Sequence, residues 1–79
     1  MSFKPLVENV IQTLVLEPEA VSVEEVEDRG ATVCHVTVAP NDVGRVIGKD
    51  GRVISCVRQL VDAAAAKAKV KAHVKVVTD

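Results

Sequence analysis

The residues of this chain best suited to bind a charged ligand are two glycines three positions apart, Gly48 and Gly51, in a charged segment. Because glycine has no Cβ atom, it lets the backbone approach a ligand closely. Lys49 and Arg52 add positive charge at the start of an expected helix, where backbone N–H groups already point outward. Residues 48–51, called the glycine loop below, therefore suit a phosphate-bearing ligand such as a sugar-phosphate backbone.

The charges of the chain are divided unevenly along its length. Residues 1–42 carry 2 basic and 8 acidic side chains, a net charge of −6, whereas residues 43–79 carry 8 basic and 3 acidic side chains, a net charge of +5. The overall charge of −1 alone gives no reason to expect a nucleic acid. Because the basic half also contains the glycine loop, the pattern indicates a polyanion-binding face.

Other chemical motifs fit the sequence poorly. The segment from Gly44 to Lys49 is one residue too short for a phosphate-binding P-loop, and no Ser or Thr follows the lysine. The spacing of Cys34, His35 and His73 matches no common zinc pattern, so we predict no metal site and no cofactor. Nor does any Ser/His/Asp or Cys/His set have a spacing that argues for catalysis, and an enzyme is the least favoured class.

Composition predicts one small domain over residues 1–79 with a core of small aliphatic side chains, because the chain has 18 valines, 9 alanines and no Trp or Tyr. Its one aromatic residue, Phe3, is expected to anchor the core, which disfavours modules that stack bases on aromatic rings. Cys34 and Cys56 both lie in apolar-patterned segments and are expected to be reduced core thiols of a cytosolic protein, with a disulfide as the alternative. We find neither a signal segment nor an apolar run of the roughly 18 residues that a membrane helix needs.

Hydrophobic periodicity predicts the elements that hold the glycine loop. Apolar residues spaced as on one helical face indicate a first helix that contains Phe3 to Leu14, with Ser2 as its N-cap. Alternating patterns then predict an antiparallel hairpin of strands 21–27 and 31–38, with a bulge where Val26 breaks the alternation.

The second half of the chain supplies the helices on either side of the glycine loop. A short helix over about 42–47, capped by Asn41 or Asp42, precedes the loop, and a longer helix over roughly 52–68 follows it. A half-buried strand over 70–77 comes last. The apolar stripe of the longer helix is expected at Val53, Val57, Leu60, Val61 and Ala64. The sequence therefore predicts an α+β fold of order α-β-β-α-α-β, with three helices packed on one face of a three-stranded sheet.

In this setting the glycine loop resembles the Gly-x-x-Gly loop of KH domains, which clamps about four nucleotides of single-stranded nucleic acid. A simple helix-helix turn that ends at Gly48 would explain one glycine, but not Lys49, Gly51 and Arg52 together. The element order is that of the type II KH fold, whereas the type I order begins with a strand and ends with a helix. Over nearly all of its length the chain resembles the small bacterial single-KH-domain proteins of the KhpA family, most specifically from Val38 to Arg52.

The resemblance implies a cytoplasmic, non-enzymatic RNA-binding protein. Proteins of that family often form homodimers or pair with a larger KH protein of the Jag type. The pair is implicated in post-transcriptional regulation or RNA chaperone activity linked to cell elongation, cell shape, cell wall organisation and envelope homeostasis. Two functions therefore stay open: a single-stranded RNA-binding module that uses the glycine loop, and a protein-interaction subunit that acts mainly by pairing.

The proposed RNA site combines the glycine loop with an adjacent aliphatic groove. Lys49 and Arg52 supply charge for the phosphates, Arg45 is placed to reach the same backbone one helical turn earlier, and Asp50 opposes them. The predicted RNA-binding residues are Val43, Arg45, Ile47, Gly48, Lys49, Asp50, Gly51, Arg52 and Ile54. Either Val36 or Val38 completes the groove, and a core role is as well supported as a groove role for both valines and for Ile54.

Overall fold

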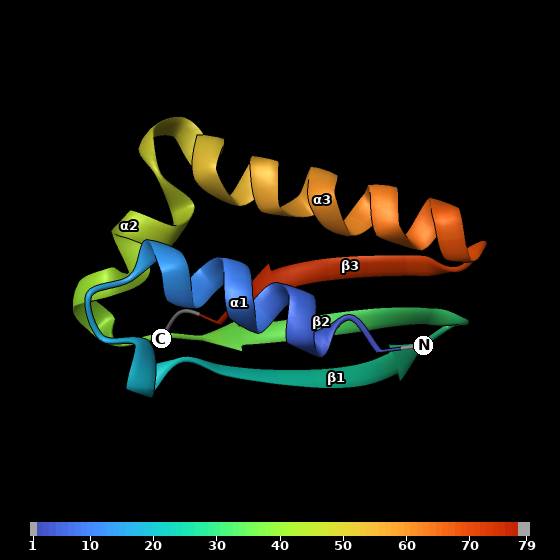
Figure 1. Cartoon of the computed structure of the whole chain (residues 1–79), viewed down its shortest axis with the longest axis horizontal. Helices are drawn as coiled ribbons and strands as arrows, with labels where there is room; N and C mark the ends of the chain where they lie inside the picture. The colour runs from blue at the N-terminus through green and yellow to red at the C-terminus, as the bar shows by residue number, and fades with distance from the viewer. Residues whose placement is uncertain (1, 78–79) are drawn as a thin grey trace.

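A computed structural model of the chain describes residues 2–77 (Figure 1). The strands β1 (Ser22–Asp28), β2 (Ala31–Thr37) and β3 (Lys71–Val76) form one sheet in the order β1-β2-β3. The helices are α1 (Lys4–Leu14), α2 (Val43–Ile47) and α3 (Arg52–Ala68), with short 3-10 turns η1 (Pro18–Ala20), η2 (Pro40–Asp42) and η3 (Lys49–Gly51). Helices α1 and α3 cover one face of the sheet, and α2 lies at the end where β2 finishes (Figure 1). This arrangement confirms the predicted α+β class and the order α-β-β-α-α-β.

The hairpin of β1 and β2 is antiparallel and regular. Its pairing runs without interruption from Ser22 opposite Thr37 to Asp28 opposite Ala31. The predicted bulge is therefore wrong, because Val26 pairs directly with Val33 and is 37% exposed. Val26 departs from the buried pattern only because residues three apart on a strand point to opposite faces of the sheet.

Strand β3 joins β2 in parallel, from Ala31 opposite Lys71 to Val36 opposite Val76. Parallel neighbours need a long crossover connection, and here α2, the glycine loop and α3 provide it. Along the chain, the glycine loop therefore lies within the crossover from β2 to β3.

The core lies between the sheet and the helices. Phe3 is 1% exposed, which confirms that it anchors the core, and Val7 and Ile11 of α1 are fully buried. The predicted stripe of α3 is partly wrong, since Leu60 is 51% exposed. The α3 residues that are buried are Ile54, Val57, Val61 and Ala65. Both sets have helical spacing, so the packing of α3 on the sheet, rather than its own pattern, sets the buried side.

The start of α1 also differs from the prediction. Phe3, not Ser2, occupies the N-cap position, and it makes no side-chain cap. Instead the Lys4 N–H donates to Oε1 of Glu25 at 2.7 Å and to Oγ of Ser2 at 3.3 Å, and the Ser2 hydroxyl donates to the same Glu25 carboxylate. A carboxylate of strand β1 thus caps the positive end of the helix.

The two cysteines are free thiols in different environments. Cys34 is fully buried in β2, but Cys56 is exposed on α3, so its predicted core position is wrong. Burial, and to a smaller extent the charge of Glu25, raises the pKa of the Cys34 thiol above its ordinary value. Cys34 is therefore a packing residue rather than a reactive one.

Candidate nucleic-acid interface

The glycine loop forms the sharp connection between α2 and α3 (Figure 1). The N–H of Gly48 donates to the carbonyl oxygen of Gly44 at 2.8 Å and ends α2. The N–H of Gly51 donates to the carbonyl oxygen of Gly48 at 3.2 Å and leads into α3. The loop thus turns the chain within four residues while its ends stay bonded to the backbone.

Gly48 is required both by its backbone conformation and by its surroundings. It has φ 77° and ψ 173°, a combination that is essentially restricted to glycine. A Cβ atom at this position would collide with Cγ2 of Val53 and lie 2.9 Å from both N and Cβ of that residue. Gly51, with φ 74° and ψ 17°, has no atom within 4 Å of such a Cβ. Gly51 is therefore favoured by conformation alone.

Asp50 occupies a left-handed position within the loop, with φ 57° and ψ 26°. Apart from glycine, Asn and Asp are the residues that best tolerate this conformation. The backbone thus supplies a local reason for an acidic residue in a basic loop. Because both Asp50 and Lys49 are exposed, the carboxylate offsets the lysine at the surface.

The exposed part of the glycine loop includes its cationic side chains. The N–H groups of Gly48 and Gly51 are bonded within the protein, to the carbonyl oxygens of Gly44 and Gly48. The side chains of Lys49 and Arg52 are exposed beside them. A glycine turn with two exposed cationic side chains at the start of a helix has the chemistry that an anion requires.

Arg45 lies one helical turn before the loop and is tied to a buried carboxylate. Its Nε atom donates to Oδ1 of Asp42 at 3.2 Å, and its side chain is 47% exposed whereas that of Asp42 is 1% exposed. Asp42 precedes α2 as predicted but makes no capping bond to that helix. It instead accepts the N–H of Leu16 at 3.2 Å and that of Glu17 at 3.1 Å.

Burial and hydrogen bonding shift the pKa of Asp42 in opposite directions. Burial by itself raises the pKa of the carboxyl group, but the amides of Leu16 and Glu17 and the guanidinium of Arg45 outweigh it and hold the pKa below its ordinary value. A group whose pKa is lowered on folding stabilises the fold above the pKa of the unfolded chain, about 3.9, and loses that effect as the pH falls through the folded value.

We therefore expect Asp42→Asn to lower the melting temperature at pH 7 by about 5 °C or more, since two backbone amides and an arginine lose a charged acceptor. The difference between wild type and variant should begin to shrink as the pH falls below about 4, where the carboxyl group of the unfolded chain becomes protonated, and should be lost below the lower pKa of the folded carboxyl group. Thermal melts followed by circular dichroism across this range measure it. A difference that stays constant down to the lowest pH at which both fold would contradict the assignment.

The aliphatic residues predicted to form a groove differ in burial. Val43 and Ile47 are half-buried on α2 and retain surface next to the loop. Ile54 is 5% exposed, Val36 0% and Val38 7%, so these three belong to the core. The structure thus brings the loop, Arg45, Val43 and Ile47 to one end of the molecule and leaves the other three beneath the surface.

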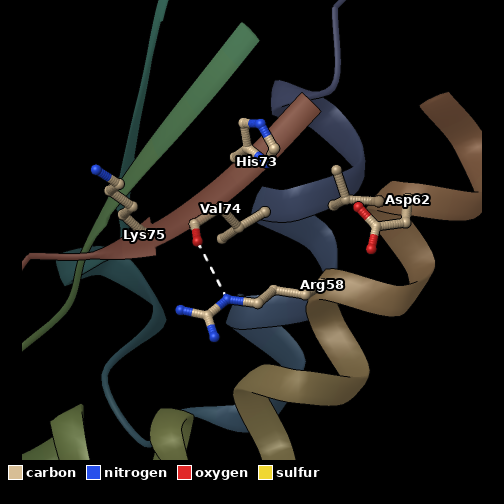
Figure 2. A pocket seen from close by; sticks show the side chains of 6 residues that line it. Arg58, Asp62, His73, Val74 and Lys75 are labelled. Atoms are coloured by element: carbon tan, nitrogen blue, oxygen red, sulfur yellow. Dashed lines mark hydrogen bonds between the residues drawn. The ribbon is translucent and has the colours of Figure 1, made fainter. Parts of the chain in front are cut away.

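A hollow of about 250 Å³ lies between α3 and β3 (Figure 2). It is lined by Arg58, Val61, Asp62, His73, Val74 and Lys75. Nε of Arg58 donates to the carbonyl oxygen of Val74 at 3.4 Å, across the hollow from helix to strand. None of these residues was predicted from the sequence to belong to a site. The alternation of Lys71, His73 and Lys75 signals one face of a strand, but not that α3 lies alongside it.

The fold and the loop together define a type II KH domain: the element order matches, and a Gly-x-x-Gly loop joins two helices before the last strand. The family model described as "KhpA/KhpB, KH domain" matches residues 4–76. The chain therefore belongs to the KhpA/KhpB family of KH-domain proteins.

Two relatives from different bacteria are both named RNA-binding protein KhpA. The chain is 40% identical over 72 residues to the RNA-binding protein KhpA of Caldanaerobacter subterraneus subsp. tengcongensis, covering 91% of this chain and 96% of that protein. It is 36% identical over 70 residues to the RNA-binding protein KhpA of Chlamydia caviae, covering 89% and 90% of the two chains.

Solved structures share the fold at low sequence identity. The crystal structure of APE1850 has a TM-score of 0.67 and 19% identity, covering 96% of this chain and 49% of that one. Era in complex with MgGDPNP and nucleotides 1506–1542 of 16S ribosomal RNA has a TM-score of 0.57 and 21% identity, covering 100% of this chain and 33% of Era. The chain thus spans about half of the first and a third of the second, and the likeness concerns the fold alone.

Within residues 2–77, no helix combines the length and apolar character that crossing a bilayer requires. Among the same residues, no three His, Cys, Asp or Glu side chains gather closely enough to hold a metal ion.

Proposed function

We propose that the chain, as a single KH domain over residues 1–79, is a non-enzymatic protein that binds single-stranded RNA through the glycine loop. The observation that carries the proposal is a Gly-x-x-Gly turn between two helices, with the exposed side chains of Lys49 and Arg52 beside it. Its relatives are named RNA-binding proteins, and the loop geometry suits their ligand. No catalytic step is needed for this role.

In this proposal the loop holds the RNA backbone. The amides of Lys49 and Asp50 donate to phosphate oxygens, and the side chains of Lys49, Arg52 and Arg45 supply the positive charge. Such contacts fix the position and direction of a strand but carry little information about its sequence. Affinity should therefore depend strongly on salt and weakly on base identity.

The bases would lie over Val43 and Ile47 and then along α3 toward the hollow beside β3. Arg58 follows Arg52 by six residues, which is about 9 Å along a helix axis. The hollow offers apolar floor from Val61 and Val74 together with polar groups for base edges (Figure 2). Because the only aromatic side chain, Phe3, is buried, base stacking on protein rings contributes nothing and affinity should be modest.

Fluorescence anisotropy of a labelled single-stranded RNA at two salt concentrations tests the proposal. Wild type should bind, and more weakly at higher salt, because each phosphate contact releases counterions. Binding that is absent, or equal at the two salt concentrations, would contradict it.

Asp50→Asn should strengthen RNA binding by about three- to tenfold at low salt, because it removes the carboxylate that opposes the phosphates. Asn tolerates the left-handed conformation as well as Asp does, so the loop should keep its shape. The same anisotropy titration, with a thermal melt as the folding control, measures this. An unchanged or weaker affinity would mean that Asp50 does not face the RNA.

The alternative function, a subunit that acts mainly by pairing with itself or with a larger KH protein of the Jag type, has a separate basis. Leu16 is 73% exposed and Leu60 is 51% exposed, surface that a partner could cover. In either case we propose a cytoplasmic protein that acts in post-transcriptional regulation or as an RNA chaperone, linked to cell elongation, cell shape and envelope homeostasis. Sedimentation equilibrium over a range of concentrations distinguishes a monomer from a homodimer.

A further inference from the structure

Asp42 stands apart from every other charged or polar residue that the structure describes, because it alone is buried. Its two carboxylate oxygens receive three hydrogen bonds, from the amides of Leu16 and Glu17 and from Nε of Arg45, at 3.1 to 3.2 Å. A buried charge is costly unless it is fully paired. This carboxylate has three donors, one of them a guanidinium, so its position relative to them is closely defined.

The donors come from two segments far apart in the sequence. Leu16 and Glu17 lie in the connection between α1 and η1, and Arg45 lies in α2, which ends at Gly48. Asp42 therefore fastens the connection after α1 to the helix that carries the glycine loop. Asp42 also bonds to Arg45, which lies one helical turn before the glycine loop.

The contact with Asp42 uses one edge of the arginine. A guanidinium carries five N–H donors in a rigid fork, and only Nε is bonded to Asp42. The side chain is 47% exposed, so the terminal Nη atoms remain for a ligand. An arginine already held by one edge has less side-chain freedom to lose when it binds a phosphate.

We propose that Asp42 is a positioning residue for RNA binding, which holds Arg45 and helix α2 so that the arginine meets an RNA phosphate next to the glycine loop. The inference rests on the proposed function, because it assumes that RNA lies along this loop. It assigns a role in binding to a residue that the RNA does not touch.

A positioning role and a simple charge effect predict opposite changes in RNA affinity for Asp42→Asn. Removing a negative charge near RNA should strengthen binding if charge alone matters. If Asp42 positions Arg45, Asp42→Asn should weaken binding by about three- to tenfold, because the arginine must be ordered on binding. Asp50→Asn is the matched control, since it removes the same charge from the loop and should strengthen binding.

The experiment is a double-mutant cycle on RNA affinity, measured by anisotropy at a temperature where circular dichroism shows each variant folded. The four proteins are wild type, Asp42→Asn, Arg45→Gln and the double variant. If Asp42 acts through Arg45, the double variant should bind within about twofold of Arg45→Gln alone. Binding by Asp42→Asn as tight as wild type, or a full additional loss in the double variant, would overturn the proposal.

Arg45→Lys gives a second test that leaves Asp42 in place, in case Asp42→Asn fails to fold. Lysine keeps the charge but lacks the fork that can bond to Asp42 and a phosphate at once. Its affinity should fall nearly as far as that of Arg45→Gln, and wild-type affinity would overturn the proposal. If wild type does not bind RNA, the proposed function is wrong. If wild type binds RNA and these variants bind with the same affinity as wild type, only the positioning role of Asp42 is wrong.

Discussion

Lys49→Asp is expected to reduce affinity for single-stranded RNA by at least about tenfold at low salt, because it reverses the charge of an exposed side chain of the glycine loop. The variant carries two adjacent acidic residues in the loop, which would repel the phosphate that the amides should receive. Lys49 is exposed, so the melting temperature should stay within about 3 °C of wild type. Anisotropy with labelled RNA, with circular dichroism as the folding control, measures both effects.

Lys4→Asp is a suitable matched control for this experiment. It makes the same change in net charge at the start of α1, at the opposite end of the molecule from the glycine loop (Figure 1). An acidic residue is also acceptable in the first turn of a helix. Equal losses in the two variants would show that only net charge matters, and no loss in Lys49→Asp would remove the loop from the binding site.

The same variant separates the two candidate functions. If pairing with another chain does not involve the loop, Lys49→Asp should lose RNA and sediment like wild type. A variant that loses both properties would show that the loop also forms part of the pairing surface.

Gly48→Ala is expected to lower the free energy of unfolding by about 2–4 kcal/mol, since it combines an unfavourable backbone conformation with a collision in a packed site. The added Cβ would meet Val53 at the start of α3. Relief of that contact would require α3 to move away from α2, and the geometry of the whole loop would change. RNA affinity should therefore fall together with stability.

Gly51→Ala is the matched control at the other end of the loop. There a Cβ meets no atom within 4 Å, and only the left-handed conformation opposes it, at a cost of about 1–2 kcal/mol. Urea denaturation followed by circular dichroism compares the two variants directly, because the chain has no tryptophan to report by fluorescence. Equal losses at the two glycines would show that Val53 does not limit the space at Gly48.

Local patterns in the sequence determined the secondary structure almost completely. The periodicity of α1 and α3, the alternation of the strands and the two glycines are properties of neighbouring residues, and short-range sterics govern them. The glycine loop was therefore predicted at its observed position, between two helices. Local sterics also explain the acidic residue at position 50, because its left-handed backbone conformation favours Asp, Asn or Gly whatever the ligand.

Tertiary structure decided which of several acceptable local solutions is used. Leu60 and Ile54 each fit a helical stripe, and only the rotation of α3 on the sheet buries Ile54 and exposes Leu60. Ser2 was a reasonable cap for α1, but Glu25 of strand β1 reaches the same amide. In both cases the deciding contact comes from a distant part of the chain.

The parts of the site that the sequence did not reveal have the same origin. Either Asn41 or Asp42 was predicted to cap α2, yet the carboxylate of Asp42 accepts hydrogen bonds from the amides of Leu16 and Glu17 and from Arg45. Arg58 reaches the carbonyl of Val74 only because the parallel crossover lays α3 along β3. The sequence by itself determined where the glycine loop would be and which residues it contains, because those features are local. Which side chains support it was settled by the packing of segments far apart in the chain, since that packing alone determines which donors a buried carboxylate can reach.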